Sequence, residues 1–335
     1  MAYICGKLQL RHGLMLAPMA GVTDYAFRRI CRMMGAEYTV SEMISAKALV
    51  YEQRSRNPAA ARSAPLAAIR AGEHGHALQL FGSDPEFMAE AARLLERGSY
   101  LSAQAEELPA AIDINMGCPV PKVAGNGEGS ALMRDPERAA AIVRAVVDAV
   151  SLPVTVKIRS GWDENSINAP EFARRMADAG AAAICIHART RKQMYAPSAD
   201  YHVIAAVKAA VDIPVIGNGD IASAADLRHM AEISGCDGYM IGRGAQGNPW
   251  LFAELTTALE GREYTPPTPE ERVAVAAEHL RLLVADKGED IGVREARKHM
   301  AWYIHSRPGS AAARAAIMQA ERAEEMLDIL QGLLN

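Results

Sequence analysis

One cysteine, placed directly after an apolar run, is the residue of this chain best suited to chemistry. Residues 113–119 (DINMGCP) predict a short buried strand, 111–115, that ends in a Gly-Cys-Pro turn. Enzymes built from α/β units place reactive groups at such strand ends. Cys118 has no cysteine close to it in the sequence with which to form a disulfide or a metal site. Its thiol can therefore act as a nucleophile, a proton donor or a small packing residue, and its place in the turn favours a chemical role.

Three more polar side chains stand at or near the ends of apolar runs. The carboxamide of Gln79 can donate and accept together, as the edge of a flavin or a pyrimidine requires. Lys157 lies between apolar residues in VTVKIR, so it needs a partner: it could form a Schiff base, stand beside a flavin, or join an ion pair. His187 is followed closely by Arg189 and Arg191, a pattern more typical of a polar site than of a core histidine.

Glycines after two later apolar runs indicate a phosphate site. One run ends in Gly217-Asn218-Gly219-Asp220 and the next continues into Gly242-Arg243-Gly244. Exposed backbone N–H groups near helix N-termini bind phosphate, and an arginine adds a charge-assisted contact. The loops after the seventh and eighth strands of α/β barrels are a recurrent phosphate site. Earlier in the chain, residues 17–21 (APMAG) would allow the backbone to lie close to a flat ligand, but they are equally consistent with a tight turn.

Eight strand-like runs, separated by helical patterns, must position these groups. The runs are 14–17, 38–40, 78–81, 111–115, 154–158, 183–187, 215–217 and 238–241. The helical patterns are 24–35, 85–97, 136–150, 170–179, 222–233 and 249–259. This alternation predicts an α/β fold, a (β/α)8 TIM barrel. A doubly wound sheet is the alternative, but no G-x-G-x-x-G follows the first strand.

The chain divides into two predicted domains. Residues 1–260 form the barrel, 261–268 are a Pro-rich linker that cannot continue a helix, and 269–335 form an all-helical C-terminal domain. Three amphipathic helices are expected in that domain, at 269–288, 292–305 and 310–334. Residues 57–75 and 98–109 are polar or irregular, and we expect surface excursions there.

Composition excludes several classes of protein. A net charge of −4 over 335 residues gives no general attraction to polyanions, and no apolar run is long enough to cross a membrane. The five cysteines are scattered and form no C-x-x-C, which argues against a metal site or a disulfide framework. We expect a cytoplasmic protein that binds no membrane and no metal.

Taken in order, these motifs resemble the tRNA-dihydrouridine synthase family, and its bacterial B-type subgroup most closely. The matching strings are LAPMAGVTD at 16–24, SEM at 41–43, DINMGCP at 113–119, VKIR at 156–159, IHARTR at 186–191, GNGD at 217–220, IGR at 241–243, GNPW at 247–250 and RKHMAWY at 297–303. The two surface excursions look longer than the family's usual loops.

The resemblance implies an oxidoreductase that uses FMN and NADPH to reduce the C5–C6 double bond of a uridine in the D-loop of tRNA, at position 17. Cys118 would give the proton to C5, and Asn115 would help to position the pyrimidine. The implied flavin contacts are Ala17, Pro18, Met19, Gln79, Lys157, His187, Asn218, Gly219, Asp220, Gly242 and Arg243. We expect a monomer.

A small basic patch in the helical domain is the candidate tRNA contact. Arg294, Arg297 and Lys298 fall near one another at helical spacing, although the domain as a whole is not basic. An ordinary solvated helix face is the competing interpretation. We expect these three side chains to contact tRNA phosphates.

Three other functions compete with this interpretation. A flavin-dependent reductase of free pyrimidines would share the cofactor and the cysteine. An aldolase would use Lys157 as a Schiff base and the glycine loops for a sugar phosphate. A non-catalytic RNA-binding protein could keep the fold without the flavin.

Overall fold

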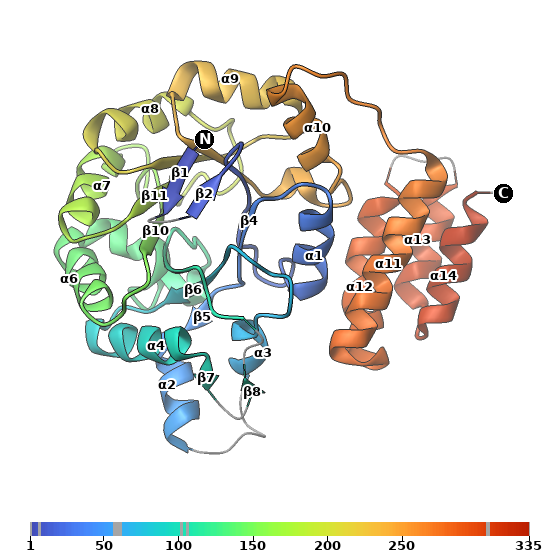
Figure 1. The fold of residues 1–335 in the computed structure, drawn as a ribbon, viewed down its shortest axis with the longest axis horizontal. Coiled ribbons are helices and arrows are strands. Elements are labelled where there is room, and N and C mark those ends of the chain that lie inside the picture. Colours follow the sequence, from blue (N-terminus) through green and yellow to red (C-terminus); the bar gives the residue numbers. More distant parts are fainter. Residues whose placement is uncertain are drawn as a thin grey trace. The chain divides into compact units, whose positions relative to one another are not determined.

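A closed ring of parallel strands forms the centre of the larger unit (Figure 1). The computed structural model describes residues 2–5, 8–55, 62–100, 103–104, 107–305 and 309–334. The ring consists of β3 (Leu14–Leu16), β4 (Tyr38–Val40), β6 (His76–Phe81), β9 (Ala111–Met116), β10 (Val154–Arg159), β11 (Ala183–His187), β12 (Val215–Asn218) and β13 (Gly238–Ile241). Pairing of β13 with β3 and of β4 with β6 closes the ring. The predicted barrel is confirmed, and each predicted strand matches an observed one to within two residues.

Successive side chains along each strand point alternately into the barrel and outward toward the helices. On β10 the apolar residues Val154, Val156 and Ile158 are buried, whereas Thr155 and Lys157 share the opposite face. A hydrophobic cluster of buried residues from several strands of the ring includes Ala111 and Cys185, together with larger side chains such as Tyr38 and Ile216.

Helices cover the outside of the ring, as Figure 1 shows. They are α2 (Ala46–Ser55), α4 (Pro85–Arg97), α6 (Pro136–Val147), α7 (Ala169–Asp178), α8 (Tyr201–Ala210) and α9 (Ala224–Ser234). The predicted start of α4 is correct, because Asp84 accepts hydrogen bonds from the N–H groups of Glu86 and Phe87. The helical patterns of the sequence predict neither α2 nor α8.

Short elements occupy the two predicted surface excursions, as far as these are described. The excursion 57–75 contains the one-turn helix α3 (Ala64–Ala67), and residues 57–61 lie outside the described part of the chain. The excursion 98–109 contains the hairpin of β7 (Ser99–Tyr100) and β8 (Ala103–Gln104), and residues 101–102 and 105–106 are likewise outside it. Near the N-terminus, β1 (Ala2–Cys5) pairs with β2 (Leu8–Leu10), and the two-residue β5 (Ile44–Ser45) adds to β6.

The chain separates into two compact units, which do not follow a single cut in the sequence. The first comprises residues 1–23, 37–221 and 225–242; the second comprises 24–36, 222–224 and 243–335. The second unit thus includes α1 (Tyr25–Met33) and α10 (Leu251–Leu259), which lie before residue 260. The predicted domain boundaries, 1–260, 261–268 and 269–335, remain a prediction. Among the described residues, no helix is both long and apolar enough to span a bilayer.

Within the described residues, four helices follow the linker, whereas the sequence predicted three. They are α11 (Pro269–Lys287), α12 (Glu289–Tyr303), α13 (Ser310–Gln319) and α14 (Ala323–Gly332). The prediction of one helix over 310–334 is wrong, because the backbone turns extended at Ala320. The carboxylate of Glu325 accepts the N–H groups of Glu321 and Arg322 and so starts α14. Apolar spacing continues across this break, which is why the sequence pattern conceals it.

Two histidines are buried together in the helical unit. The rings of His279 and His299 lie 4.5 Å apart, and both lie within 6 Å of the ring of Phe27. Nδ1 of His279 shares a hydrogen bond with the hydroxyl of Tyr303, whereas Nε2 of each histidine has no partner among the described residues. Burial lowers the pKa of His279 to about 4 and the pKa of His299 well below its usual value. Both rings are therefore neutral in the folded unit at pH 7.

This cluster predicts acid sensitivity of the helical unit. Unfolded histidine takes up a proton near pH 6.5, whereas His279 does so only near pH 4. The folded state therefore loses stability as pH falls from about 6.5 toward 4, by up to roughly 1.4 kcal/mol per pH unit for each histidine. Urea unfolding between pH 7.5 and 4.5 will measure this slope. His299→Leu is expected to reduce it, whereas substitution of the exposed His202 by Gln is not. An unchanged slope in His299→Leu would contradict the assignment.

Candidate active site

Polar side chains from five adjacent strands meet at the carboxyl end of the barrel. Strand register pairs Gln79 with Asp113, Lys157 with both Asn115 and Cys185, and His187 with Asn218. Because the strands are parallel, residues in register lie at one level of the ring. The predicted residues therefore occupy successive levels: Gln79 lies one level below Asn115 and Lys157, and His187 and Asn218 lie one level above them. Hydrogen bonds join Gln79 to Asn115 and Lys157 to Asn218 across these levels.

A buried carboxylate anchors one side of this surface. Gln79 Nε2 donates to Asp113 Oδ2 over 2.7 Å, and the hydroxyl of Thr155 donates to Asp113 Oδ1. Burial raises the pKa of Asp113 to about 6, although these two hydrogen bonds and Lys157 oppose the change. Asp113 and Thr155 were not predicted from the sequence as parts of the site. Their period-two spacing from Asn115 and Lys157 was the available signal.

The side chain of Asn115 joins this anchor to the cysteine turn. Its Nδ2 donates to Gln79 Oε1 at 2.8 Å. Its Oδ1 accepts the backbone N–H groups of Gly117, at 3.2 Å, and of Cys118, at 2.9 Å. Both ends of this amide are therefore engaged in fixing the turn that presents Cys118.

Arg159 holds the turn from the other side. Its Nε donates to the carbonyl of Gly117 at 2.9 Å, and its Nη1 donates to the carbonyls of Thr190 and Met194. Arg159 is only 4% exposed, and burial lowers its pKa to about 10. The guanidinium remains charged at neutral pH and connects the cysteine turn to the loop after β11.

The thiol of Cys118 is held in its protonated form. Burial is the largest cause and raises its pKa, whereas a hydrogen bond with the backbone of Val120 and the charge of Arg159 act to lower it. Such a thiol is a poor nucleophile at neutral pH but a competent proton donor. The raised pKa is therefore consistent with a proton donor among the chemical roles open to a strand-end cysteine.

Lys157 projects into the barrel toward Asn218. Its Nζ donates to Asn218 Oδ1 at 3.0 Å, and Asn218 Nδ2 donates to the carbonyl of Met240 at 2.7 Å. Burial lowers the pKa of Lys157, and the charge of Asp113 works against that change. A single amide is a weak partner for a buried ammonium, which leaves Lys157 able to bind an electron-rich ligand edge.

The predicted phosphate loops contain an unexpected ion pair. Arg189, 3% exposed, donates to both carboxylate oxygens of Asp220, at 2.8 and 2.5 Å. Oδ2 of Asp220 also accepts the N–H of Ala199. Gly219 has φ +139°, and a Cβ there would come within 2.8 Å of the side chain of Ala199. The Asp220 side chain thus fixes the turn, so any contact with an anion here would fall to backbone groups.

The remaining predicted residues fall into two groups. A Cβ on Gly242 would lie 3.7 Å from the side chains of both Ala17 and Met19, so the first and last barrel strands bring these predicted residues together. Arg243 begins the short 3-10 helix η3 (Arg243–Ala245) and belongs to the helical unit. Arg294, Arg297 and Lys298 all lie on α12 of that unit, and no site joining the two units is described.

These features define a (β/α)8 barrel enzyme with a protonated thiol, an amide pair and a lysine at the carboxyl ends of its strands. A family model described as "Dihydrouridine synthase (Dus)" matches residues 15–334. The chain therefore belongs to the dihydrouridine synthase family.

Several curated relatives agree over most of the chain. The tRNA-dihydrouridine synthase B of Pseudomonas aeruginosa is 43% identical over 92% of this chain and 89% of its own length. The tRNA-dihydrouridine synthase B of Vibrio cholerae is 42% identical over 98% of both chains. A probable tRNA-dihydrouridine synthase of Rickettsia conorii is 42% identical over 93% of this chain and 90% of its own length.

Solved structures support the fold alone. A histamine dehydrogenase from Rhizobium sp. 4-9 aligns with TM-score 0.52 and 13% identity, over 81% of this chain and 49% of its own. An amine oxidase (HisD) from Pseudomonas geniculata aligns with TM-score 0.54 and 13% identity, over 84% and 52%. This chain spans about half the length of these two structures.

The role of Asn115 can be measured through the reactivity of Cys118. Asn115→Ala removes the acceptor of two turn N–H groups, each worth roughly 1 kcal/mol. We therefore expect about a tenfold faster alkylation of Cys118 by iodoacetamide, followed by mass spectrometry of its peptide. In the unaltered protein the rate should rise with pH through a midpoint above the usual thiol pKa. Asn165→Ala, in an exposed loop, is the control, and equal rates in both variants would contradict the role.

Proposed function

We propose that this chain reduces the C5–C6 double bond of a uridine in tRNA, with FMN at the barrel mouth and NADPH as the reductant. Membership of the dihydrouridine synthase family supports the reaction. The single observation that carries the proposal is the cysteine turn. It presents a thiol with a raised pKa at the carboxyl end of the barrel, between the anchor of Asn115 and that of Arg159.

The residues at the barrel mouth fit a flavin mononucleotide. Lys157 offers a cation of the kind that binds the electron-rich N1–C2=O edge of a flavin. Gly242 lies beside Ala17 and Met19, since a Cβ there would be 3.7 Å from each side chain, and the proposal places the flavin ring against these residues. In this proposal the ring and ribityl contacts are completed by Pro18, Gln79 and His187. The phosphate is held by backbone groups of Asn218, Gly219 and Asp220, together with Gly242 and Arg243. When bound, reduced FMN supplies the hydride that adds to C6 of uracil.

Cys118 completes the reaction by proton transfer. Addition of hydride at C6 leaves enolate-like charge on the uracil ring, and that charge is discharged when C5 takes a proton. The S–H of Cys118 provides the proton, and the resulting thiolate recovers one from water. Because the pKa of Cys118 is raised, the thiol is ready in the correct state at neutral pH. Asn115 fixes the direction of this donor and leaves one N–H of its amide for the pyrimidine.

Binding to tRNA requires a second surface, because the target base must leave the folded RNA to enter the barrel mouth. We assign this surface to α12. Arg294 is exposed and its guanidinium makes no ion pair within the described residues. The guanidinium of Arg297 donates to the carbonyl of Ala320 at 2.9 and 3.2 Å, so phosphate contacts fall mainly to Arg294 and Lys298. Position 17 of the D-loop, a cytoplasmic location and a monomeric state belong to the same proposal.

An anaerobic spectral titration tests the reaction. The purified protein should show an oxidised flavin spectrum that bleaches with NADPH and returns with tRNA lacking dihydrouridine. Cys118→Ala should keep the flavin and its reduction by NADPH. It should lose about 10²-fold or more of the tRNA-dependent reoxidation, because a positioned general acid contributes at least that much.

Three results would contradict the proposal. Reoxidation by free uridine but not by tRNA would favour a pyrimidine reductase. A colourless protein that borohydride traps with a sugar phosphate at Lys157 would favour an aldolase. Full activity of Cys118→Ala would remove the cysteine from the mechanism.

The tRNA surface can be tested by salt dependence. Substituting Arg294 by Ala should weaken tRNA binding and reduce the slope of log Kd against log salt by about one for each phosphate that the variant no longer neutralises. Fluorescence anisotropy between 50 and 300 mM salt measures both quantities. Arg228→Ala, which removes an exposed arginine of α9, is the control, and identical slopes for the two variants would reject the assignment.

A further inference from the structure

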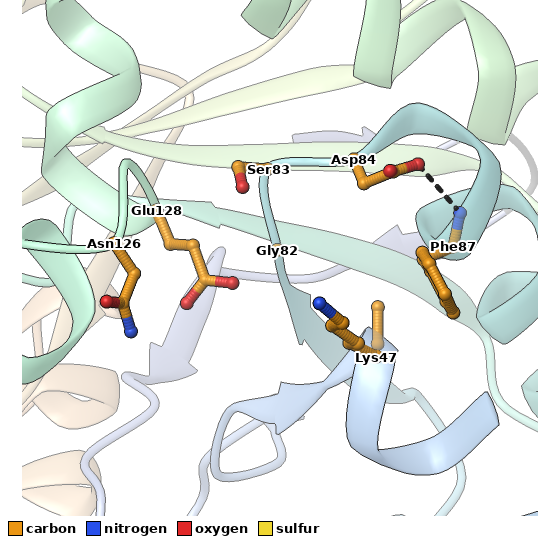
Figure 2. Close-up of a pocket in the computed structure, with 8 residues that line it drawn as sticks. Lys47, Gly82, Ser83, Asp84, Phe87, Asn126 and Glu128 are labelled. Carbon is orange, nitrogen blue, oxygen red and sulfur yellow. Dashed lines mark hydrogen bonds between the residues drawn. The ribbon is translucent and has the colours of Figure 1, made fainter. Parts of the chain in front are cut away.

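A polar pocket of about 300 Å³ opens beside the loop that carries Cys118. It lies between the start of α2, the loop from β6 to α4, and the segment joining α5 (Pro121–Ala124) to the 3-10 helix η2 (Gly129–Arg134). Figure 2 shows its lining, which includes Lys47, Ser83, Phe87, Asn126 and Glu128. None of these residues has a place in the reaction proposed above.

The pocket and the cysteine share a wall. Ser130 donates its N–H to the carbonyl of Cys118 at 3.1 Å. A Cβ on Gly129 would lie 3.1 Å from the Cβ of Cys118. Glu128, on the pocket side, is therefore one residue away from the glycine that packs against the cysteine. A short segment, residues 128–130, therefore separates the pocket from Cys118.

Two opposite charges line the pocket, on the exposed Lys47 and the half-buried Glu128. The ammonium of Lys47 and the carboxylate of Glu128 point toward the same space in Figure 2, and within the described residues neither charged group forms a hydrogen bond or an ion pair. The ammonium of Lys47 lies 6.0 Å from the ring centre of Tyr51 and 5.8 Å from that of Phe87. Burial raises the pKa of Glu128, and the charge of Lys47 opposes this change. A ligand that joins a donor and an acceptor would satisfy both groups.

Guanine matches this arrangement of one donor and one acceptor. Its Watson–Crick edge carries the O6 acceptor beside two adjacent donors, N1–H and the N2 amine. Adenine, cytosine and uracil each carry only one donor group on this edge. A carboxylate accepts two parallel N–H groups well, and an ammonium donates to O6. The ring of Phe87 gives the base an aromatic contact. The volume is at the lower end of ligand pockets, which suits one base better than a dinucleotide.

We propose that this pocket binds a guanine that is adjacent in the RNA to the uridine being reduced. The inference rests on the proposed function and extends it to sequence context. Lys47 contacts O6, and Glu128 accepts N1–H and the N2 amine. The enzyme thereby distinguishes target uridines by their neighbour as well as by the fold of the tRNA.

Synthetic tRNAs with single base replacements test the pocket. Each neighbour of the target uridine is changed in turn to adenine, inosine or 2-aminopurine, and both kcat/KM for dihydrouridine formation and Kd by anisotropy are measured. At one neighbour, adenine should lower kcat/KM by roughly 5- to 100-fold, the usual cost of removing one base-edge pair. Inosine, which lacks only the N2 amine, should cost less.

Two pocket variants and a control assign the effect to residues. Glu128→Gln should remove most of the difference between guanine and inosine. Lys47→Met should reduce, but not abolish, the difference between guanine and 2-aminopurine, which lacks both O6 and N1–H. Glu86→Gln changes an exposed carboxylate in the first turn of α4, outside the pocket lining, and should keep the preference of the unaltered enzyme.

The outcomes separate the two proposals. Indifference of the unaltered enzyme to both neighbours, or unchanged preferences in Glu128→Gln and Lys47→Met, would overturn the guanine pocket while the reaction stands. A guanine-dependent Kd without any reduction of uridine would overturn the proposed reaction and leave the pocket in place. Failure to bind any of these RNAs would overturn both.

Discussion

The buried hydrogen bonds of Asn115 are the interaction on which the rest of the site depends. The side-chain amide of Asn115 connects two groups. It bonds to Gln79, which with Asp113 forms a hydrogen-bonded layer inside the barrel, and it also bonds to the backbone of the cysteine turn. Barrel strands are held by many backbone bonds, whereas a turn of four residues has few of its own. By accepting two N–H groups of the turn, Asn115 gives Cys118 the rigidity of the barrel. Arg159 supplies the matching constraint from the neighbouring strand.

Hydrogen bonds inside the barrel also explain how acidic and basic side chains can lie together where little water reaches them. Asp113, Lys157 and Arg159 are close in register, and their pKa values move toward the neutral forms because burial removes water. Each group still keeps at least one hydrogen bond: Asp113 with Gln79, Lys157 with Asn218, and Arg159 with the carbonyl of Gly117. A ligand that enters the barrel mouth therefore meets polar groups whose positions are already set, which reduces the reorganisation needed during reaction.

The sequence predicted the barrel because strand and helix patterns alternate with capped helix starts, such as Asp84 before Pro85. It also predicted which residues stand at strand ends, including Cys118 and Lys157. The sequence could not show which side chains contact each other. Arg189 and Asp220 follow two different strands, so the residue pattern along either strand alone does not predict their ion pair. The break between α13 and α14 was missed for a similar reason. It depends on the carboxylate of Glu325 reaching back to two N–H groups, while the apolar spacing continues unbroken.

The close approach of Gly129 to Cys118 also limits how this chain can change over evolutionary time. Gly129 has φ +58°, and a Cβ there would lie only 3.0 to 3.1 Å from Cys118 and Val123, so a side chain at this position would strain the backbone and press on the cysteine. Evolutionary change in the nearby pocket is then expected through amino-acid substitutions at fixed backbone positions, such as Lys47 or Glu128. Homologues with new preferences are expected to differ here in residue identity while the loop keeps its length.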